Sequence, residues 1–311
     1  MEKIHIGALP PPLGGISIYL YRLQKYSNTD TVVDEIQLNK IQFVKLLLKK
    51  NKHFVYHSPN LIRRLLVYLF SSIMGNQFTI VSHGDGLKNS YINSNMFIKY
   101  LIKRMLKKAT SIQTVNHKIA DFLVQVLNIE KDKIYTQHAF LPPPLEDEKA
   151  ILSTYEKELL DFVEQNRPLI IANASSIAWY KEQDLYGLDM CVQLVDNLKK
   201  EYPNIGLVFA LANIGDEAYY QKIGLKIKQL KLEQSVYFMT GQKELWPLFK
   251  KANVMVRPTC SDGYGISIAE ALYFKCPAVA SDVCDRPEGT VLFENRDQNG
   301  FYDKVREVLE K

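Results

Sequence analysis

The sequence is poor in cysteine and has no long apolar run. Its 311 residues include 4 Cys, and none of these forms a Cys-x-x-Cys pair. A disulfide-stapled secreted scaffold and a zinc site are therefore disfavoured, and buried reduced thiols in a reducing cytosol are expected. The longest apolar run, Leu65 to Met74, is well short of the roughly 20 residues that cross a bilayer. The chain begins without the charged and apolar regions of a secretion signal, so we expect a cytoplasmic protein.

Neither disorder nor a repetitive fibre fits the remaining composition. Hydrophobic residues make up 47% and charged residues 23% of the chain, with 15 Gly and 13 Pro. This length suits two domains that each bury a core. The segment Pro142 to Pro144, followed by acidic residues, can continue neither a helix nor a central strand. We therefore expect domains at residues 1–145 and 146–311.

Short β-rich apolar runs alternate with longer amphipathic segments, which is the pattern of parallel α/β units. The pattern predicts two doubly wound α/β domains, whose ligands bind in the cleft between them. Strands are expected near 3–8, 53–57, 78–82, 111–115, 133–136, 168–173, 205–211, 235–239, 253–256 and 278–281. Helices are expected near 15–26, 60–74, 93–109, 117–127, 148–165, 184–200, 216–230, 243–250, 265–274 and 300–310.

Charge is distributed unevenly between the two halves. Residues 1–150 carry 20 Lys and Arg against 11 Asp and Glu, whereas residues 151–311 carry 19 against 23. A basic first half suits nucleic acid, anionic lipid or a phosphorylated substrate, although solvated lysines alone also explain it.

Three strand ends in the first half carry residues suited to a site. Gly14 and Gly15 follow the first strand at a strand-to-helix turn, where the backbone can approach a phosphate closely, although a plain tight turn also explains them. They do not form the Gly-x-Gly-x-x-Gly fingerprint of dinucleotide-binding oxidoreductases. His57 and His83 each end a buried strand, where substrates lie, and capping or packing is the alternative role. Gly84, Asp85 and Gly86 predict an open loop after His83.

The passage 254–282 is the most informative. A buried strand runs into a glycine-rich loop with Asp262, then a helix that carries Glu270, then a second buried strand. The two carboxylates can face one pocket, and the start of the helix can donate N–H groups to a phosphate. Carboxylates also accept hydrogen bonds from the paired hydroxyls of a ribose or hexose.

This passage resembles the retaining, nucleotide-sugar-dependent glycosyltransferases of family 4, which have the GT-B fold. Their signature is an acid, seven residues, a Glu and a small-residue helix before a Pro-Val-Val-Ala-Ser strand. Asp262, Glu270 and Cys276 to Ser281 match that pattern. Gly14-Gly15, the two histidine-ended strands and Gly187-Leu188-Asp189 follow the family's order. The resemblance covers nearly the whole chain and implies two Rossmann-like domains that face each other across a cleft.

The resemblance also implies roles for individual residues. Gly14 and Gly15 look like the loop near the donor diphosphate and the acceptor. His83 is similar to the histidine near the anomeric carbon, and Asp262 to the acid that contacts the transferred sugar. Glu270 resembles the acid that binds the ribose hydroxyls. The phosphate donors would be Gly265, Ile266 and Ser267.

Two departures from the family pattern affect the site. The first acid is usually Glu, and here it is Asp262. The usual Arg and Lys that hold the diphosphate are missing, because residues 173–176 contain no Arg and Tyr186 precedes Gly187. Lys181 and Arg286 are the nearest replacements, with Arg257 or the helix start as the remaining possibility. A surface charge or a structural ion pair also explains each of them.

The resemblance implies a hexose transferase acting in surface polysaccharide or lipopolysaccharide synthesis. Its cosubstrate would be a sugar nucleotide linked to UDP or GDP, and its acceptor a glycan or a lipid-linked saccharide. No cofactor, metal or nucleic acid is expected, and no Asp-x-Asp cluster is present. A non-catalytic GT-B subunit that binds a sugar nucleotide or a partner transferase is the alternative, and a sugar-nucleotide epimerase is a third possibility.

A basic amphipathic segment suggests a peripheral site at the inner membrane face. Residues 93–109 interleave apolar residues with Lys and Arg at near-helical spacing, as interfacial helices do. Arg63 and Arg64 are expected to add to the same face. Packing of the apolar stripe against the sheet is the alternative.

Overall fold

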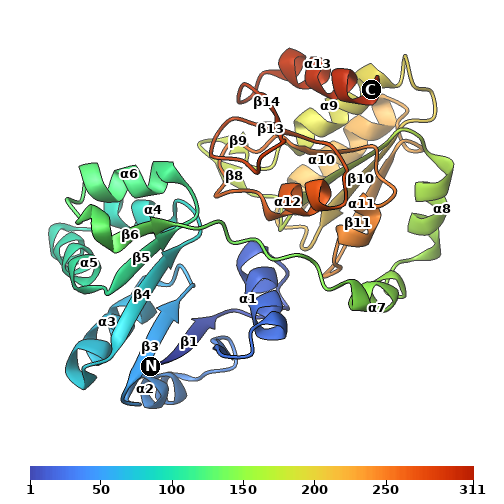
Figure 1. Ribbon diagram of the computed structural model, residues 1–311. Coiled ribbons are helices and arrows are strands. Elements are labelled where there is room, and N and C mark those ends of the chain that lie inside the picture. Colours follow the sequence, from blue (N-terminus) through green and yellow to red (C-terminus); the bar gives the residue numbers. More distant parts are fainter. The chain divides into compact units, whose positions relative to one another are not determined.

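The computed structural model describes all of residues 1–311, which divide into two compact units, Met1–Leu141 and Pro142–Lys311. The sequence places the boundary slightly later in the same proline-rich segment. Each unit contains a six-stranded parallel sheet with helices packed on it (Figure 1). The predicted pair of doubly wound α/β units is therefore confirmed.

The first sheet has the strand order β2-β1-β3-β4-β5-β6, and every pair is parallel. Its strands are β1 (Glu2–Gly7), β2 (Thr31–Asp34), β3 (Lys52–Tyr56), β4 (Gln77–Ser82), β5 (Ser111–Thr114) and β6 (Ile134–Thr136). The helices are α1 (Gly15–Tyr26), α2 (Lys40–Leu47), α3 (Leu61–Met74), α4 (Gly86–Ile92), α5 (Met96–Lys108) and α6 (His117–Gln125). The strand order reverses between β1 and β3, and ligands of such sheets bind outside the strand ends at this point.

The two faces of the first sheet differ in polarity because alternate strand residues point to opposite faces. Ile4, Phe54 and Ile80 belong to a core with buried residues of α2, α3 and α5. The opposite face carries His5, from β1, and polar residues of the neighbouring strands. The helix α1 packs against β1 and β2.

The second sheet has the order β11-β10-β7-β12-β13-β14, again all parallel. Its strands are β7 (Leu169–Ala174), β10 (Gly206–Leu211), β11 (Val236–Thr240), β12 (Val254–Arg257), β13 (Ala278–Ser281) and β14 (Val291–Phe293). Its helices are α7 (Glu148–Leu152), α8 (Lys157–Gln165), α9 (Leu188–Leu198), α10 (Glu217–Gln229), α11 (Trp246–Phe249), α12 (Ile266–Tyr273) and α13 (Gln298–Leu309). The order reverses between β7 and β12. A separate antiparallel hairpin is formed by β8 (Trp179–Tyr180) and β9 (Gln183–Asp184).

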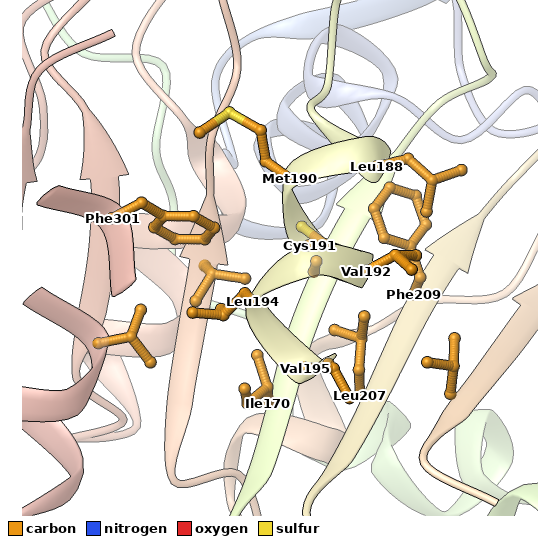
Figure 2. Packing of buried hydrophobic residues seen from close by; sticks show 14 of the residues in the cluster. Ile170, Leu188, Met190, Cys191, Val192, Leu194, Val195, Leu207, Phe209 and Phe301 are labelled. Carbon is orange, nitrogen blue, oxygen red and sulfur yellow. The ribbon is translucent and has the colours of Figure 1, made fainter. Parts of the chain in front are cut away.

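Two apolar layers cover the second sheet. Ile170 packs in one layer with residues of α9 and α13, such as Leu194 and Phe301 (Figure 2). Leu169 and Ile171 pack in the other layer. Buried residues on both faces explain why the strands of this unit are continuous apolar runs. All four cysteines are buried free thiols.

The predicted elements differ from the structure in several places. The short edge strands β2 and β14 and the helix α2 were not predicted. The predicted helix at 148–165 is two helices, because Glu156 is extended at the start of α8. The open loop expected at Gly84, Asp85 and Gly86 is shorter than predicted, because Gly86 already begins the helix α4. The helix predicted at 93–109 begins at Met96 as α5. Asn95 caps its start, because the Asn95 side chain accepts a hydrogen bond from the Ile98 N–H. No helix is both long and apolar enough to span a membrane.

Candidate functional site

The first cluster is a file of three imidazoles on neighbouring strands. His5 Nδ1 lies 2.9 Å from His57 Nε2, and His57 Nδ1 lies 2.9 Å from His83 Nε2. At the far end, His5 Nε2 lies 3.5 Å from an Asp30 carboxylate oxygen. The two predicted histidines are therefore in direct contact. His5 and Asp30 were not predicted, although a histidine between Ile4 and Ile6 in the strand pattern was the available signal.

Strand register explains why the three rings meet. His5 pairs with Val55, and Tyr56 pairs with Ile80, so the histidines lie diagonally on one face of β1, β3 and β4. Gly7 leaves room for this arrangement, since an added Cβ would lie 3.1 Å from the His57 Cβ. The Tyr19 ring, from α1, lies 5.8 Å from the His57 ring and 6.1 Å from the His83 ring.

The imidazole file is neutral at pH 7. Burial lowers the pKa of His5 to about 4, although Asp30 acts in the opposite direction. Burial and the neighbouring rings hold the pKa of His57 well below its usual value. Burial and the charge of Arg64 likewise lower the pKa of His83. The Arg64 guanidinium is itself buried and donates to the backbone carbonyls of Ser58 and Val81.

The turn before α1 contains the predicted glycines. Gly14 has an extended backbone, and a Cβ added to it would meet no atom within 4 Å. Neither backbone strain nor packing within the chain therefore requires glycine here. The Ser17 hydroxyl fixes the turn, because it donates to the Pro12 carbonyl at 2.6 Å, lies 3.0 Å from the Gly14 carbonyl oxygen and accepts from the Gly14 N–H. Gly15 is the first residue of α1.

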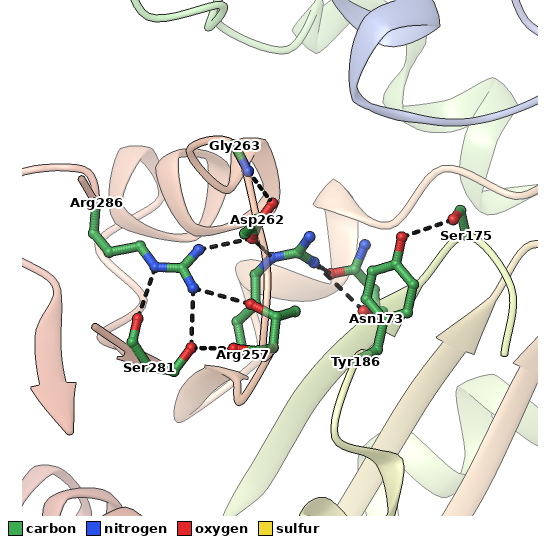
Figure 3. Close-up of polar contacts among 9 residues, drawn as sticks. Asn173, Ser175, Tyr186, Arg257, Asp262, Gly263, Ser281 and Arg286 are labelled. Carbon is green, nitrogen blue, oxygen red and sulfur yellow. Dashed lines mark hydrogen bonds and ion pairs between the residues drawn. The ribbon is translucent and has the colours of Figure 1, made fainter. Parts of the chain in front are cut away.

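The second cluster has an acid held between two arginines. An Asp262 carboxylate oxygen lies 2.5 Å from Arg257 Nε and 2.7 Å from Arg286 Nη1 (Figure 3). Burial alone would raise the pKa of the Asp262 carboxyl, but the two guanidinium charges and their hydrogen bonds outweigh burial and hold that pKa far below its usual range. The three side chains together carry one excess positive charge.

Each arginine has further partners that fix its position. Arg257, at the end of β12, donates through Nη1 to the Asn173 side-chain oxygen at 3.0 Å. Arg286 donates to the Ser281 carbonyl at 3.0 Å and to the Thr259 hydroxyl at 3.0 Å. Because Asn173 and Arg257 lie near the ends of β7 and β12, the cluster sits where the strand order reverses.

The start of α12 adjoins this cluster. Gly265 has φ +94°, and an added Cβ would lie 3.1 Å from Arg286 Nη1 and 2.7 Å from Ile268 Cδ1. The first N–H groups of any helix lack intrahelical acceptors, and here they belong to Ile266 and Ser267. The Ser267 hydroxyl is buried without a hydrogen-bond partner. Glu270 is buried one turn further along.

The two positions where the resemblance predicted a basic pair lie next to each other. The Tyr186 hydroxyl lies 2.9 Å from the Ser175 hydroxyl, and the Arg257 guanidinium lies 5.6 Å from the Tyr186 ring centre. Arg257 thus brings positive charge to these positions from a different strand. Lys181 is exposed in the β8–β9 hairpin, 5.5 Å from the Tyr180 ring centre.

Neither cluster forms a metal cage. No group of three or more His, Cys, Asp or Glu side chains within residues 1–311 is placed to hold a metal ion. The facing nitrogens of the imidazole file are occupied by one another.

Comparison with known proteins gives one family match and one curated relative. Residues 163–311 match the family described as glycosyl transferases group 1. The O-antigen chain mannosyltransferase RfbU of Salmonella typhimurium is 20% identical over 190 residues, which cover 60% of this chain and 46% of RfbU. The chain thus spans about half the length of this relative.

Solved structures resemble the whole chain. Anabaena Alr3699/HepE, solved in complex with UDP, has a TM-score of 0.72 at 11% identity, covering 100% of this chain and 90% of HepE. An α,α-trehalose-phosphate synthase (UDP-forming) from Burkholderia xenovorans has a TM-score of 0.68 at 10% identity, covering 99% and 92%. The chain therefore has the GT-B fold, and its residues 163–311 match the glycosyl transferases group 1 family.

Proposed function

We propose that the protein is a retaining glycosyltransferase of family 4 in surface polysaccharide synthesis. It transfers a hexose from a UDP- or GDP-linked donor to a glycan or lipid-linked acceptor. The observation that carries this proposal is the cluster of Arg257, Asp262 and Arg286 beside the start of α12, within the group 1 domain. HepE, which has a similar fold, has been solved with UDP-glucose.

Residues 146–311 bind the donor in this proposal. Glu270 accepts hydrogen bonds from the ribose hydroxyls, and N–H groups of Gly265, Ile266 and Ser267 donate to the diphosphate. The positive charge beside them comes from Arg286 and Arg257, since Asp262 neutralises only one of the two. This charge replaces the missing basic pair and stabilises the leaving diphosphate.

The proposed role of Asp262 is narrower than that of a free carboxylate. One of its oxygens binds both arginines, and the other accepts from the Gly263 N–H at 2.9 Å. Both oxygens of the Asp262 carboxylate thus already accept hydrogen bonds. A contact with the transferred sugar would have to use a further lone pair on one of them. Lys181 is a second candidate for the diphosphate, supplied by the hairpin.

Residues 1–145 bind the acceptor, with Gly14 and Gly15 at the ligand and His83 near the transferred sugar. In the proposed front-face displacement, the acceptor oxygen bonds to the anomeric carbon while the bond from that carbon to the diphosphate breaks. The acceptor proton passes to a departing phosphate oxygen. The protein contributes orientation and charge stabilisation.

The experiment combines a donor panel with one substitution. The protein should transfer or hydrolyse one of a set of UDP- and GDP-sugars, detected by mass spectrometry. Glu270→Ala should weaken binding of the matching nucleoside diphosphate roughly tenfold or more in calorimetry, because charge-assisted hydrogen bonds to the ribose are lost. Nucleotide binding without turnover on any donor would instead favour a non-catalytic subunit. Unchanged affinity with an intact fold would remove Glu270 from the site.

A peripheral position on the inner membrane face belongs to the same proposal. Met96, Phe97 and Tyr100 of α5 are 81%, 67% and 57% exposed, whereas Met105 and Leu106 are buried in the core. The helices α3 and α5 pack together, and α3 adds the exposed residues Ile62, Leu69 and Ile73.

The predicted contribution of Arg63 and Arg64 to this face is wrong. Arg64 is buried, and Arg63 forms an ion pair with Glu35 at 3.0 Å. The basic charge in this proposal is that of α5 itself, where Arg104, Lys107 and Lys108 are exposed. Sedimentation with anionic liposomes at low salt should recover more protein than neutral liposomes do, and added salt should remove the difference. Equal recovery would contradict the membrane position.

A further inference from the structure

The imidazole file ends on a carboxylate at one side and is open at the other. Asp30, whose side chain is 23% exposed, faces His5 Nε2 at 3.5 Å. His83 Nδ1 has no hydrogen-bond partner within the chain and is not among the buried unpartnered atoms, so it is open to solvent. Both links between the rings are 2.9 Å long, which is an ordinary hydrogen-bond length.

Hydrogen-bond accounting leaves one direction for the file. Each neutral imidazole has one N–H donor and one acceptor nitrogen. His5 Nε2 is buried and forms no hydrogen bond within the chain, but a carboxylate oxygen of Asp30 lies 3.5 Å from it. A carboxylate attracts an N–H and repels a nitrogen lone pair, so the hydrogen of His5 is placed on Nε2. His5 Nδ1 then accepts from His57 Nε2, and His57 Nδ1 accepts from His83 Nε2. The opposite direction would place a lone pair of His5 against a carboxylate in a buried setting, where such repulsion is costly.

We propose that Asp30, acting through His5 and His57, holds His83 in the tautomer with its hydrogen on Nε2 and its acceptor lone pair on Nδ1. Asp30, His5 and His57 are positioning residues in this arrangement. His83 Nδ1 therefore presents a fixed acceptor at the carboxyl edge of the sheet. This nitrogen can accept a hydrogen bond from a hydroxyl group, and it repels an oxygen that can only accept hydrogen bonds.

The catalytic consequence rests on the proposed function. If His83 contacts the transferred sugar, it accepts a hydrogen bond from a sugar hydroxyl and thereby orients the sugar. Burial favours this neutral form, as do the charge of Arg64 near His83 and the charges of Lys3 and His53 near His5, whereas Asp30 acts in the opposite direction at His5. Protonation of His83 would place a hydrogen on Nδ1, and this nitrogen would then donate a hydrogen bond and could no longer accept one.

Nitrogen NMR of the full chain tests the tautomer without any substrate. Long-range proton–nitrogen spectra of histidine-labelled protein distinguish the two neutral tautomers and the cation, and single His→Gln spectra assign the signals. At pH 7.5 we expect His83 to carry its hydrogen on Nε2. A hydrogen on Nδ1 in the wild-type protein would overturn the proposal.

Three variants test the chain of contacts. Asp30→Ala changes a partly exposed side chain and should shift His83 toward a mixture of tautomers. His57→Leu should do the same by breaking the file. His57→Gln should preserve the wild-type tautomer, because its amide provides one acceptor and one donor. His53→Gln is the control, since His53 lies on the same sheet face but binds Thr79 at 2.7 Å. An unchanged His83 tautomer in both Asp30→Ala and His57→Leu would overturn the proposal.

Kinetics test the consequence for the reaction. Asp30→Ala and His57→Leu should lower kcat roughly tenfold, the effect of one hydrogen bond, with KM for the donor nearly unchanged. His57→Gln should recover most of the loss. If these variants shift the His83 tautomer but keep the wild-type kcat, the proposed role of the tautomer in catalysis is wrong. A wild-type protein that uses no sugar nucleotide would refute the proposed function, while the NMR result would still decide the tautomer.

Discussion

At the scale of single residues, Asp262 balances two buried charges. The exposed fractions of its side chain and those of Arg257 and Arg286 are 13%, 11% and 2%. Removing one member of a buried ion-pair cluster leaves the others uncompensated. We expect Asp262→Asn to lower the free energy of unfolding by about 3 kcal/mol, measured by urea denaturation.

The matched control is a more exposed ion pair in the same unit. Asp189 pairs with Arg296, and their side chains are 32% and 28% exposed. Solvent screens such pairs, so Asp189→Asn should cost about 1 kcal/mol or less. Equal losses in the two variants would show that Asp262 has no special structural role.

At the scale of elements, the starts of α1 and α12 contain glycine for different reasons. Gly265→Ala should destabilise the protein by about 1 to 3 kcal/mol and weaken nucleotide binding, because φ is +94° and the new Cβ would crowd Arg286. Gly14→Ala should leave the free energy of unfolding unchanged, since its backbone is extended and the space beside it is open. Urea denaturation and a transfer assay measure both effects.

The Gly14 variant separates a structural role from close ligand approach. A loss of activity at full stability is expected if a ligand lies against this turn. Wild-type activity in Gly14→Ala would argue that the turn does not need glycine for binding.

The sequence predicted the elements whose signals are local. The helix at 15–26 matches α1, and the buried strands of the second unit lie within a residue of their predicted positions. The edge strands β2 and β14 were missed because they have only four and three residues and are only partly buried, so periodicity is weak there. The β8–β9 hairpin has two residues per strand, which leaves almost no pattern to detect.

The sequence singled out His57 and His83 because each follows a buried strand. It singled out Asp262 and Glu270 by their spacing in the passage 254–282. The contact of His57 with His5 depends on β1 lying beside β3, and that of Arg257 with Asn173 depends on β12 lying beside β7. Strand order is a property of the assembled sheet, so these partners were not available from local patterns.

At the scale of the whole molecule, the buried histidines couple stability to pH. His5, His57 and His83 all have lowered pKa values in the folded state. The unfolded chain binds protons at these residues below about pH 6.5, whereas the folded chain does not until about pH 4 for His5. The unfolded state therefore holds more protons in this window, and the free energy of unfolding falls as the pH falls.

Urea denaturation at pH 7.5, 6.0 and 5.0 should show this decline. The slope should become smaller in His57→Gln, because one of the buried titrating groups is removed. A free energy of unfolding that is constant from pH 7.5 to 5.0 would contradict the buried, neutral state of the imidazole file.

The parallel order of the second sheet also has a consequence for the sequence of folding events. β7, β10 and β11 are joined by successive crossovers, but β12 pairs with β7 across a separation of more than eighty residues. Loop closure of that length is slow compared with local pairing. During synthesis, Asn173 leaves the ribosome long before Arg257 and Arg286. The cluster of Arg257, Asp262 and Arg286 therefore forms only after β12 has joined β7, which is a late step in the assembly of this sheet.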